Sequence, residues 1–297
     1  MPVNLQNSKI QSLPSLSAKG VSVDILRLDL VHPVISGNKW FKLQYYLQDA
    51  IHTGKTTIAS FGGAYSNHIV ATAFAAKEAD LQSIGFIRGE RGATLSPTLQ
   101  NAIKYGMQLV FVERDLYRNK QLIIQQNSDS QFYWIMEGGY GKLGSKGAAD
   151  ILKLANTSLY THILCAAGTG TMLSGLIRSS LPYQELIGIS VLKNHTEMEN
   201  DVRALLSEGE NKKHFSIIHD FHFGGYAKHP RELIAFMEDT WSKEKLPTDI
   251  VYTAKLLFAA KQLIVAGHFR SGARVLLIHS GGLQGNASLP PNTIPFS

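Results

Sequence analysis

Short apolar runs alternate with longer segments of helical periodicity along almost the whole chain. The apolar runs predict buried strands at 56–61, 82–87, 108–112, 132–137, 161–167, 186–192 and 273–279. Apolar residues that recur every three or four positions predict helices from about 39 onward and near 66–79, 95–105, 145–156, 171–180, 195–207, 229–241 and 253–268. The segment 114–131 is polar, and the first 20 residues and the tail 289–297 look irregular. This alternation predicts an α/β fold of parallel sheets covered by helices on both faces.

The length of the chain favours two hydrophobic cores over one. It has 297 residues, 44% of them hydrophobic and 18% charged, as is usual for a soluble globular protein. Internal repeats, low-complexity tracts and an obvious linker are all missing from the sequence. If there are two domains, one is therefore expected to be inserted in the other.

Charge and cysteine content narrow the class of protein. The net charge is +6, but the lysines and arginines are scattered, so nucleic-acid binding is not favoured. A single cysteine, Cys165, excludes an intramolecular disulfide and fits a reducing compartment. The sequence shows neither a signal-peptide pattern nor an apolar run of the roughly 20 residues that a membrane span needs. We therefore expect a cytoplasmic protein that does not act at a membrane.

The segment SGNKWFKL, from Ser36 to Leu43, places a lysine at the start of a helix. Asn38 is the predicted N-cap, so Lys39 falls in the first turn, where the helix dipole disfavours its positive charge. Lys42, about one turn away, adds like-charge repulsion. Both effects favour the neutral, nucleophilic amine of Lys39. A solvated lysine without a role is the alternative.

Two further segments lead from a strand through glycines into a helix. In FGGAYSNH, Ser66, Asn67 and His68 stand at a helix start, where they could seat a carboxylate or merely cap the helix. In CAAGTGTM, the backbone and hydroxyls of 168–171 form a candidate phosphate cradle; a tight turn with two capping threonines is the alternative. The cradle comprises Gly168, Thr169, Gly170 and Thr171.

Other candidates are less distinctive when taken alone. Ser280 ends the last strand and could hydrogen-bond a ring nitrogen, or be a plain turn serine. Tyr226 and Tyr252 stand beside small residues, although tyrosines in such places are usually core. The sequence has no H-E-x-x-H motif, no Cys/His cluster and no G-x-S-x-G elbow, so we expect neither a metal site nor a serine hydrolase.

Together these segments suit one cofactor. An activated lysine, a seat for an anion, a phosphate cradle and a hydroxyl at a strand end would all be used by a molecule with an aldehyde, a ring nitrogen and a phosphate. Pyridoxal 5′-phosphate has these three groups.

The same segments resemble a known family. SGNKWFKL, GGAYSNH, the glycine pair after Glu137, GTGTMLSGL, GGYAKHP, VYTAK and HSGG occur in the order seen in fold-type II (tryptophan synthase β-like) pyridoxal-phosphate enzymes. They are most similar to D-cysteine desulfhydrase and 1-aminocyclopropane-1-carboxylate (ACC) deaminase, and the resemblance spans about residues 10–285. It implies two three-layer domains with parallel sheets, a larger one of 1–44 and 149–297 and a smaller inserted one of 45–148. It also implies a homodimer.

The resemblance implies roles for particular residues. Lys39 would join the cofactor and later move the Cα proton. Ser66 would seat the substrate carboxylate and act as nucleophile or proton carrier, while Tyr226 and Tyr252 would flank the substrate. Asn67 and His68 would also lie at the substrate. The residues expected to hold the cofactor, besides Lys39, are Lys42, Asn67, Gly168, Thr169, Gly170, Thr171, Thr253 and Ser280.

Position 253 indicates which branch of the family the chain resembles more. ACC deaminases typically carry glutamate where this chain has Thr253, and a hydroxyl leaves the ring nitrogen largely neutral. His68, where the deaminases have glutamine, and Ser280 favour the same branch. We therefore predict α,β-elimination on a small amino acid, with D-cysteine giving pyruvate, ammonia and sulfide.

Two alternatives stay open at this point. One is ACC deaminase, which would release 2-oxobutyrate and ammonia; the other is an amino-acid sensor that binds the cofactor with little turnover. The second is suggested by departures from the family near the substrate side. These departures are Trp40, Phe41, Ala227 and Ala254.

Overall fold

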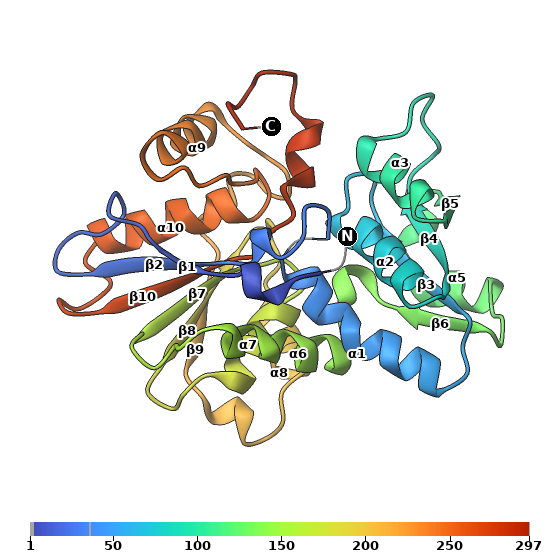
Figure 1. The fold of residues 1–297 in the computed structure, drawn as a ribbon, viewed down its shortest axis with the longest axis horizontal. Helices are drawn as coiled ribbons and strands as arrows, with labels where there is room; N and C mark the ends of the chain where they lie inside the picture. The colour runs from blue at the N-terminus through green and yellow to red at the C-terminus, as the bar shows by residue number, and fades with distance from the viewer. Residues whose placement is uncertain (1–2, 36, 297) are drawn as a thin grey trace.

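A computed structural model describes residues 3–35 and 37–296, and these form two parallel sheets with helices between and around them (Figure 1). The larger sheet has the strand order β1-β2-β10-β7-β8-β9, and the smaller has the order β5-β4-β3-β6. All neighbouring strands are parallel except β1 and β2. The predicted α/β class with parallel sheets is therefore confirmed.

The strands of the two sheets come from different parts of the chain. The larger sheet consists of β1 (Ile10–Ser12), β2 (Ser22–Arg27), β7 (His162–Ala167), β8 (Glu185–Ser190), β9 (Phe215–Ile218) and β10 (Arg274–His279). The smaller sheet consists of β3 (Thr57–Gly62), β4 (Gln82–Arg88), β5 (Met107–Val112) and β6 (Phe132–Ile135). The smaller sheet is thus built entirely from a segment that lies within the sequence of the larger one.

Each sheet carries helices on both faces. On the larger sheet, α10 (Thr253–Val265) covers one face and α6 (Lys142–Ala149) and α7 (Thr171–Ser179) the other; α8 (Met198–Arg203) lies beside α7, and α9 (Arg231–Glu244) packs outside α10. On the smaller sheet, α1 (Asn38–His52), α2 (Asn67–Glu78) and α3 (Pro97–Lys104) cover one face. The short helices α4 (Arg114–Arg118) and α5 (Lys120–Gln126) contribute residues to the core on its other face.

Helix α1 joins the two cores. Phe41 packs into the core under α7, whereas Leu43 and Leu47 pack into the core of the smaller sheet. All three side chains are buried, and burying each stabilises the fold by about 1.5–3 kcal/mol. The first turn of α1, which carries Lys39, is therefore held between the two sheets (Figure 1).

Several sequence predictions require correction. The first 20 residues are not wholly irregular, since β1 lies within them, and the polar segment 114–131 contains α4 and α5. The strands β2 and β9 were not predicted. Asp24 and Arg27 interrupt the apolar run of β2, and both side chains find polar partners: Ser12 donates to Asp24, and Arg27 donates to Asp29. In the described part of the chain, the structure holds no helix long and apolar enough to cross a membrane.

Candidate active site

The first turn of α1 differs from the prediction in its cap. Asn38 is the first residue of the helix, and Gly37 precedes it with φ 76° and makes no side-chain cap bond. A Cβ on Gly37 would lie 1.7 Å from the Ser280 carbonyl oxygen, so this approach of two backbones requires glycine. Ser36, also taken as a start signal, lies outside the described residues. Lys39 falls in the first turn, as predicted.

Lys39 is partly buried beside aromatic and amide groups. Its Nζ donates to Asn38 Oδ1 at 2.9 Å and lies 5.7 Å from the centroid of the Tyr252 ring. Burial lowers the pKa of Lys39 to about 8, and the nearby Asp249 carboxylate partly offsets the effect. The predicted direction of the pKa shift is thus found, but its main cause is burial, which the helix-dipole and repulsion arguments had not included.

Lys42 is buried one turn further along α1. Its Nζ donates to the Gly138 carbonyl at 3.2 Å, and burial followed by repulsion from Lys39 holds its pKa well below the usual range. Gly139 packs against the same side chain, since a Cβ there would lie 3.3 Å from Lys42 Cβ. The glycine pair after Glu137 thus brings the smaller sheet's last strand to α1.

The start of α2 presents a buried acceptor that lacks a partner. Ser66 is the N-cap and accepts from the Ile69 N–H at 3.4 Å. Asn67 Nδ2 donates to the Gly282 carbonyl at 2.8 Å, while Asn67 Oδ1 is buried with no hydrogen-bond partner. A buried acceptor without a donor costs about 1–3 kcal/mol, so a ligand donor would be favoured there.

His68 is buried and neutral. Its Nε2 lies 2.8 Å from Ser60 Oγ, and that hydroxyl donates to the Ile135 carbonyl at 2.7 Å. Because Ser60 has one proton to donate, His68 carries its proton on Nε2 and its Nδ1, also without a partner, is a second bare acceptor. Burial, followed by repulsion from Lys39 and Lys42, holds the pKa of His68 well below its usual range.

The loop of Gly168, Thr169, Gly170 and Thr171 connects β7 to α7. Gly170 is the N-cap with φ 73°, no side chain caps the helix, and the hydroxyls of Thr169 and Thr171 lie 2.9 Å apart. The alternative of two capping threonines is therefore wrong. The helix start keeps its N–H groups free of side-chain caps, which suits an anion.

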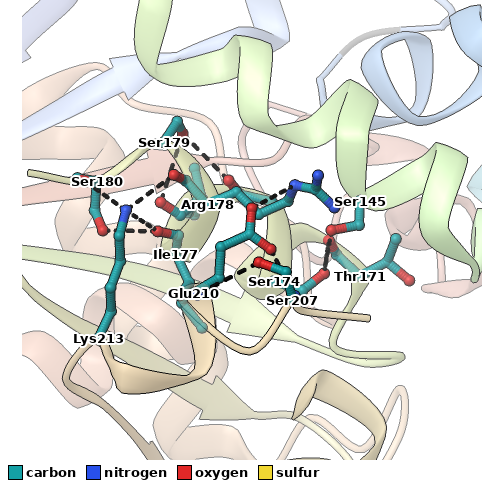
Figure 2. A network of polar contacts seen from close by, with 12 residues as sticks. Ser145, Thr171, Ser174, Ile177, Arg178, Ser179, Ser180, Ser207, Glu210 and Lys213 are labelled. Carbon is teal, nitrogen blue, oxygen red and sulfur yellow. Dashed lines mark hydrogen bonds and ion pairs between the residues drawn. The ribbon is translucent and has the colours of Figure 1, made fainter. Parts of the chain in front are cut away.

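Helix α7, which follows this loop, is held in place by a polar network along its middle and C-terminal end (Figure 2). Lys213 donates to the carbonyls of Ile177, Arg178 and Ser180 at 2.8–2.9 Å, where a cation complements the C-terminal end of the helix. Ser174 Oγ donates to the Thr171 carbonyl at 2.8 Å and lies 2.9 Å from Ser145 Oγ on α6, whose hydroxyl can donate to it. The direction of the helix start is set by these contacts.

Tyr252 and Tyr226 stand together opposite Lys39. Their ring centroids are 6.2 Å apart at 80°, and Tyr226 is 47% exposed, so it is no ordinary core tyrosine. Burial raises the pKa of Tyr252 well above its usual value, and the neighbouring Tyr226 raises it further. Although the side chain as a whole is half exposed, desolvation of its hydroxyl raises the pKa of Tyr226, against a hydrogen bond from Tyr252 that lowers it.

The Thr253 hydroxyl makes two hydrogen bonds to Asp249. Its Oγ1 donates to Asp249 Oδ1 at 2.7 Å and accepts from the Asp249 N–H at 2.7 Å. A contact between Thr253 and a cofactor stays a prediction: the hydroxyl can accept one further hydrogen bond, whereas donating to a ring nitrogen would require its bond to Asp249 Oδ1 to break. Ser280 lies next to the start of α1, where its carbonyl accepts from the Asn38 N–H at 3.1 Å.

Sequence reasoning missed two residues of this region. Asp249 is fully buried and accepts from the N–H groups of Val251, Tyr252 and Thr253 at 2.8–3.0 Å. Asking which side chain caps the helix after 252 would have found it. His195, 3.0 Å from the Asp201 carboxylate, lies in the loop just before α8, where the sequence predicted the start of a helix but no site residue. It lines a cleft of about 220 Å³ with Gly168, Thr169, Tyr140, Leu192 and Asp201.

The predicted residues are therefore gathered from both sheets at one place. Lys39 contacts Tyr252, and Tyr252 contacts both Tyr226 and Gly168, where a Cβ would lie 3.3 Å from the Tyr252 ring. Asn67 bonds to the turn after Ser280. No group of three or more His, Cys, Asp or Glu side chains that could hold a metal occurs in residues 3–35 and 37–296.

Comparison with known proteins gives consistent matches over more than nine-tenths of the chain. The profile of the family described as "Pyridoxal-phosphate dependent enzyme" matches residues 4–281. A putative 1-aminocyclopropane-1-carboxylate deaminase of Thermotoga maritima is 31% identical over 95% of this chain and 96% of its own length. A D-cysteine desulfhydrase of Klebsiella pneumoniae is 24% identical over 92% of this chain and 90% of its own length. A crystal structure of an ACC deaminase homologue superposes with a TM-score of 0.81 and 27% identity, over 96% of this chain and 92% of that one.

Proposed function

We propose that this chain, which belongs to the family of pyridoxal-phosphate-dependent enzymes, catalyses α,β-elimination on a small amino acid. The preferred substrate would be D-cysteine. The products would be pyruvate, ammonia and sulfide. The observation that carries the proposal is the partly buried Lys39 amine, with a pKa of about 8, beside an uncapped helix start and the Tyr252 ring.

The residues present fit the cofactor of the family. Asn67 Oδ1 is a buried acceptor in need of a donor, the start of α7 is free of side-chain caps, and the Lys39 amine has its pKa lowered toward neutrality. When bound, pyridoxal phosphate supplies an aldehyde for covalent attachment and an electron sink for a developing negative charge at Cα. Lys39 would hold it covalently, and the 168–171 loop with Lys42 would hold its phosphate.

The remaining roles follow from the position of each side chain. Asn67 would accept a hydrogen bond from the ring hydroxyl, and Ser280 would face the ring nitrogen. Ser66 and the N–H groups of the α2 start would seat the substrate carboxylate. Lys39, as a free amine, would take the Cα proton, a step that general-base catalysis accelerates by about 10²–10⁴. Tyr226 and Tyr252 would enclose the substrate and exclude water.

The preference for D-cysteine rests on position 253. Position 253 is a threonine whose hydroxyl donates to Asp249, so no acid stands there to keep a ring nitrogen protonated. A weaker electron sink favours loss of a good leaving group such as sulfide. ACC deamination is the second candidate, because the relative at 31% identity carries that name.

Spectroscopy and product assays test the proposal together. The purified protein with pyridoxal phosphate should show the visible absorbance of a lysine-bound cofactor, and Lys39→Ala should abolish it, whereas the exposed control Lys104→Ala should keep it. D-cysteine should release pyruvate and sulfide. A colourless protein would contradict the assignment, and 2-oxobutyrate from ACC alone would show that the deaminase is right. Retained colour without product from amino acids of either hand would indicate a sensor.

We also propose that residues 45–148 form a smaller inserted domain. The chain would act in the cytoplasm as a homodimer. It would bind a small amino acid, and neither a nucleic acid nor a membrane. The strands β3 to β6 support the inserted domain, since they form a sheet of their own. The single buried cysteine suits a reducing compartment. Light scattering should give twice the chain mass of 32.7 kDa, and a value near one chain would contradict the dimer.

A further inference from the structure

Lys255 is a fully buried lysine that the proposed reaction does not use. It lies on α10, one turn after Tyr252, in a helix whose other buried side chains are nearly all apolar. Burying an ammonium group is unfavourable unless it is fully hydrogen-bonded. Its Nζ donates to the carbonyls of His222 and Gly225, at 3.0 and 2.7 Å. Both acceptors belong to the turn that leads directly into Tyr226.

That turn has a backbone that ordinary residues avoid. Phe223, Gly224, Gly225 and Ala227 all have positive φ, at 53°, 91°, 124° and 56°. Two of the four are not glycine, so this conformation is strained and must be held by its surroundings. Within the turn, the Gly225 N–H donates to the His222 carbonyl at 3.0 Å, and the Gly224 N–H donates to His222 Nδ1 at 2.9 Å.

One face of α10 makes the contacts that hold this strained turn. Tyr252, Lys255 and Phe258 are three residues apart and therefore share a face of the helix. Phe258 packs edge-to-face on Phe223 with ring centroids 4.9 Å apart, Lys255 binds the backbone on either side of Phe223, and Tyr252 meets Tyr226. An aromatic contact, two charge-assisted hydrogen bonds and the tyrosine pair thus hold the strained turn against α10.

We propose that Lys255 is a positioning residue for Tyr226: its ammonium group ties the 222–225 turn to α10 and so fixes the separation of Tyr226 from Tyr252 at the substrate side. The inference rests on the proposed function for the role of Tyr226, but its structural half does not. Among the turn's contacts, these two bonds are the ones made by a charged donor, which are about twice as strong as neutral ones.

Hydrogen exchange and steady-state kinetics of the full-length protein loaded with pyridoxal phosphate test the proposal. Lys255→Met should make amides of 221–228 exchange at least about tenfold faster, because two bonds to a charged donor are lost. It should raise KM for the amino acid that is turned over by about tenfold while changing kcat by less than about threefold. Lys261→Met is the matched control, since Lys261 lies on the same helix with its Nζ 5.6 Å from the centroid of the Phe236 ring, and it should change neither.

A second variant keeps the test decisive if Lys255→Met does not fold. Gly225→Ala leaves α10 intact but places a side chain at φ 124°, and should produce the same faster exchange and the same rise in KM. Exchange of 221–228 within twofold of the wild type, or faster exchange with unchanged KM, would overturn the inference. If no amino acid is turned over, the proposed function fails, while the exchange result still decides whether Lys255 orders the turn.

Discussion

The first turns of α1 and α10 meet in the site, yet they are built in opposite ways. At α10, the carboxylate of Asp249 accepts from three backbone N–H groups and from the Thr253 hydroxyl. At α1, Gly37 offers no side chain, and the Asn38 N–H bonds to a backbone carbonyl. One helix start is neutralised by a carboxylate and presents a tyrosine; the other has no side-chain cap and presents an amine, whose pKa is lowered by burial.

The lysines of the two helices sharpen this contrast. Burial lowers the pKa of both Lys39 and Lys255 to about 8, and Asp249 partly offsets the effect in both. Their partners differ, since Lys39 donates to one side-chain amide and Lys255 to two backbone carbonyls. A lowered pKa therefore does not by itself distinguish a nucleophilic lysine from a structural one.

Removing the carboxylate cap should give the largest effect. Asp249→Ala leaves three N–H groups and a hydroxyl unpaired in the interior, so we expect the free energy of unfolding to fall by about 3–5 kcal/mol. Urea denaturation measures it. Ser66→Ala at the start of α2, where the cap bond is 3.4 Å long, should cost only about 1 kcal/mol. Equal losses would mean that the α10 start is not specially capped.

Filling the uncapped start of α7 should have an intermediate effect. Gly170→Ala places a side chain at φ 73° and 2.6 Å from Val202 Cγ2, so we expect a loss of about 1–3 kcal/mol in stability. The affinity for pyridoxal phosphate should fall as well, because the N–H groups of the loop are displaced. Gly209→Ala, at negative φ with open space around it, is the control and should alter neither quantity.

The smallest effect concerns pH. Lys39 attacks an aldehyde only as the free amine, whose fraction rises about tenfold between pH 7 and pH 9 for a pKa near 8. The rate at which the cofactor-free protein takes up pyridoxal phosphate should rise accordingly and then level off. Lys255→Met should keep this profile, since Lys255 is held by the backbone. A flat rate between pH 7 and pH 9 would contradict the lowered pKa of Lys39.

The sequence pattern predicted most of the fold because the strands of both sheets are largely apolar on both faces and are separated by periodic helices. It missed β2, whose Asp24 and Arg27 are satisfied by partners far apart in the chain. It also missed β9, an edge strand of four partly buried residues. Such elements depend on tertiary partners that no local pattern contains.

At the site, the glycine-rich strand ends pointed to residues that the structure brings together. The sequence did not show which hydrogen-bond partners the hydroxyls and carboxylates of the site have. Thr253 was expected to be free for a cofactor, but Asp249 holds it. The cause of the lowered pKa at Lys39 was likewise hidden, because burial is a property of the packed chain and the dipole argument considers one helix alone.

The bond between Thr253 and Asp249 also constrains how this protein could evolve. A change of Thr253 to the acid typical of ACC deaminases would set two carboxylates side by side in a fully buried place and remove the hydroxyl that Asp249 binds. An acid at 253 would therefore need a paired substitution at 249. The single variant would fold poorly, so the tolerance of position 253 to an acid depends on which residue stands at 249.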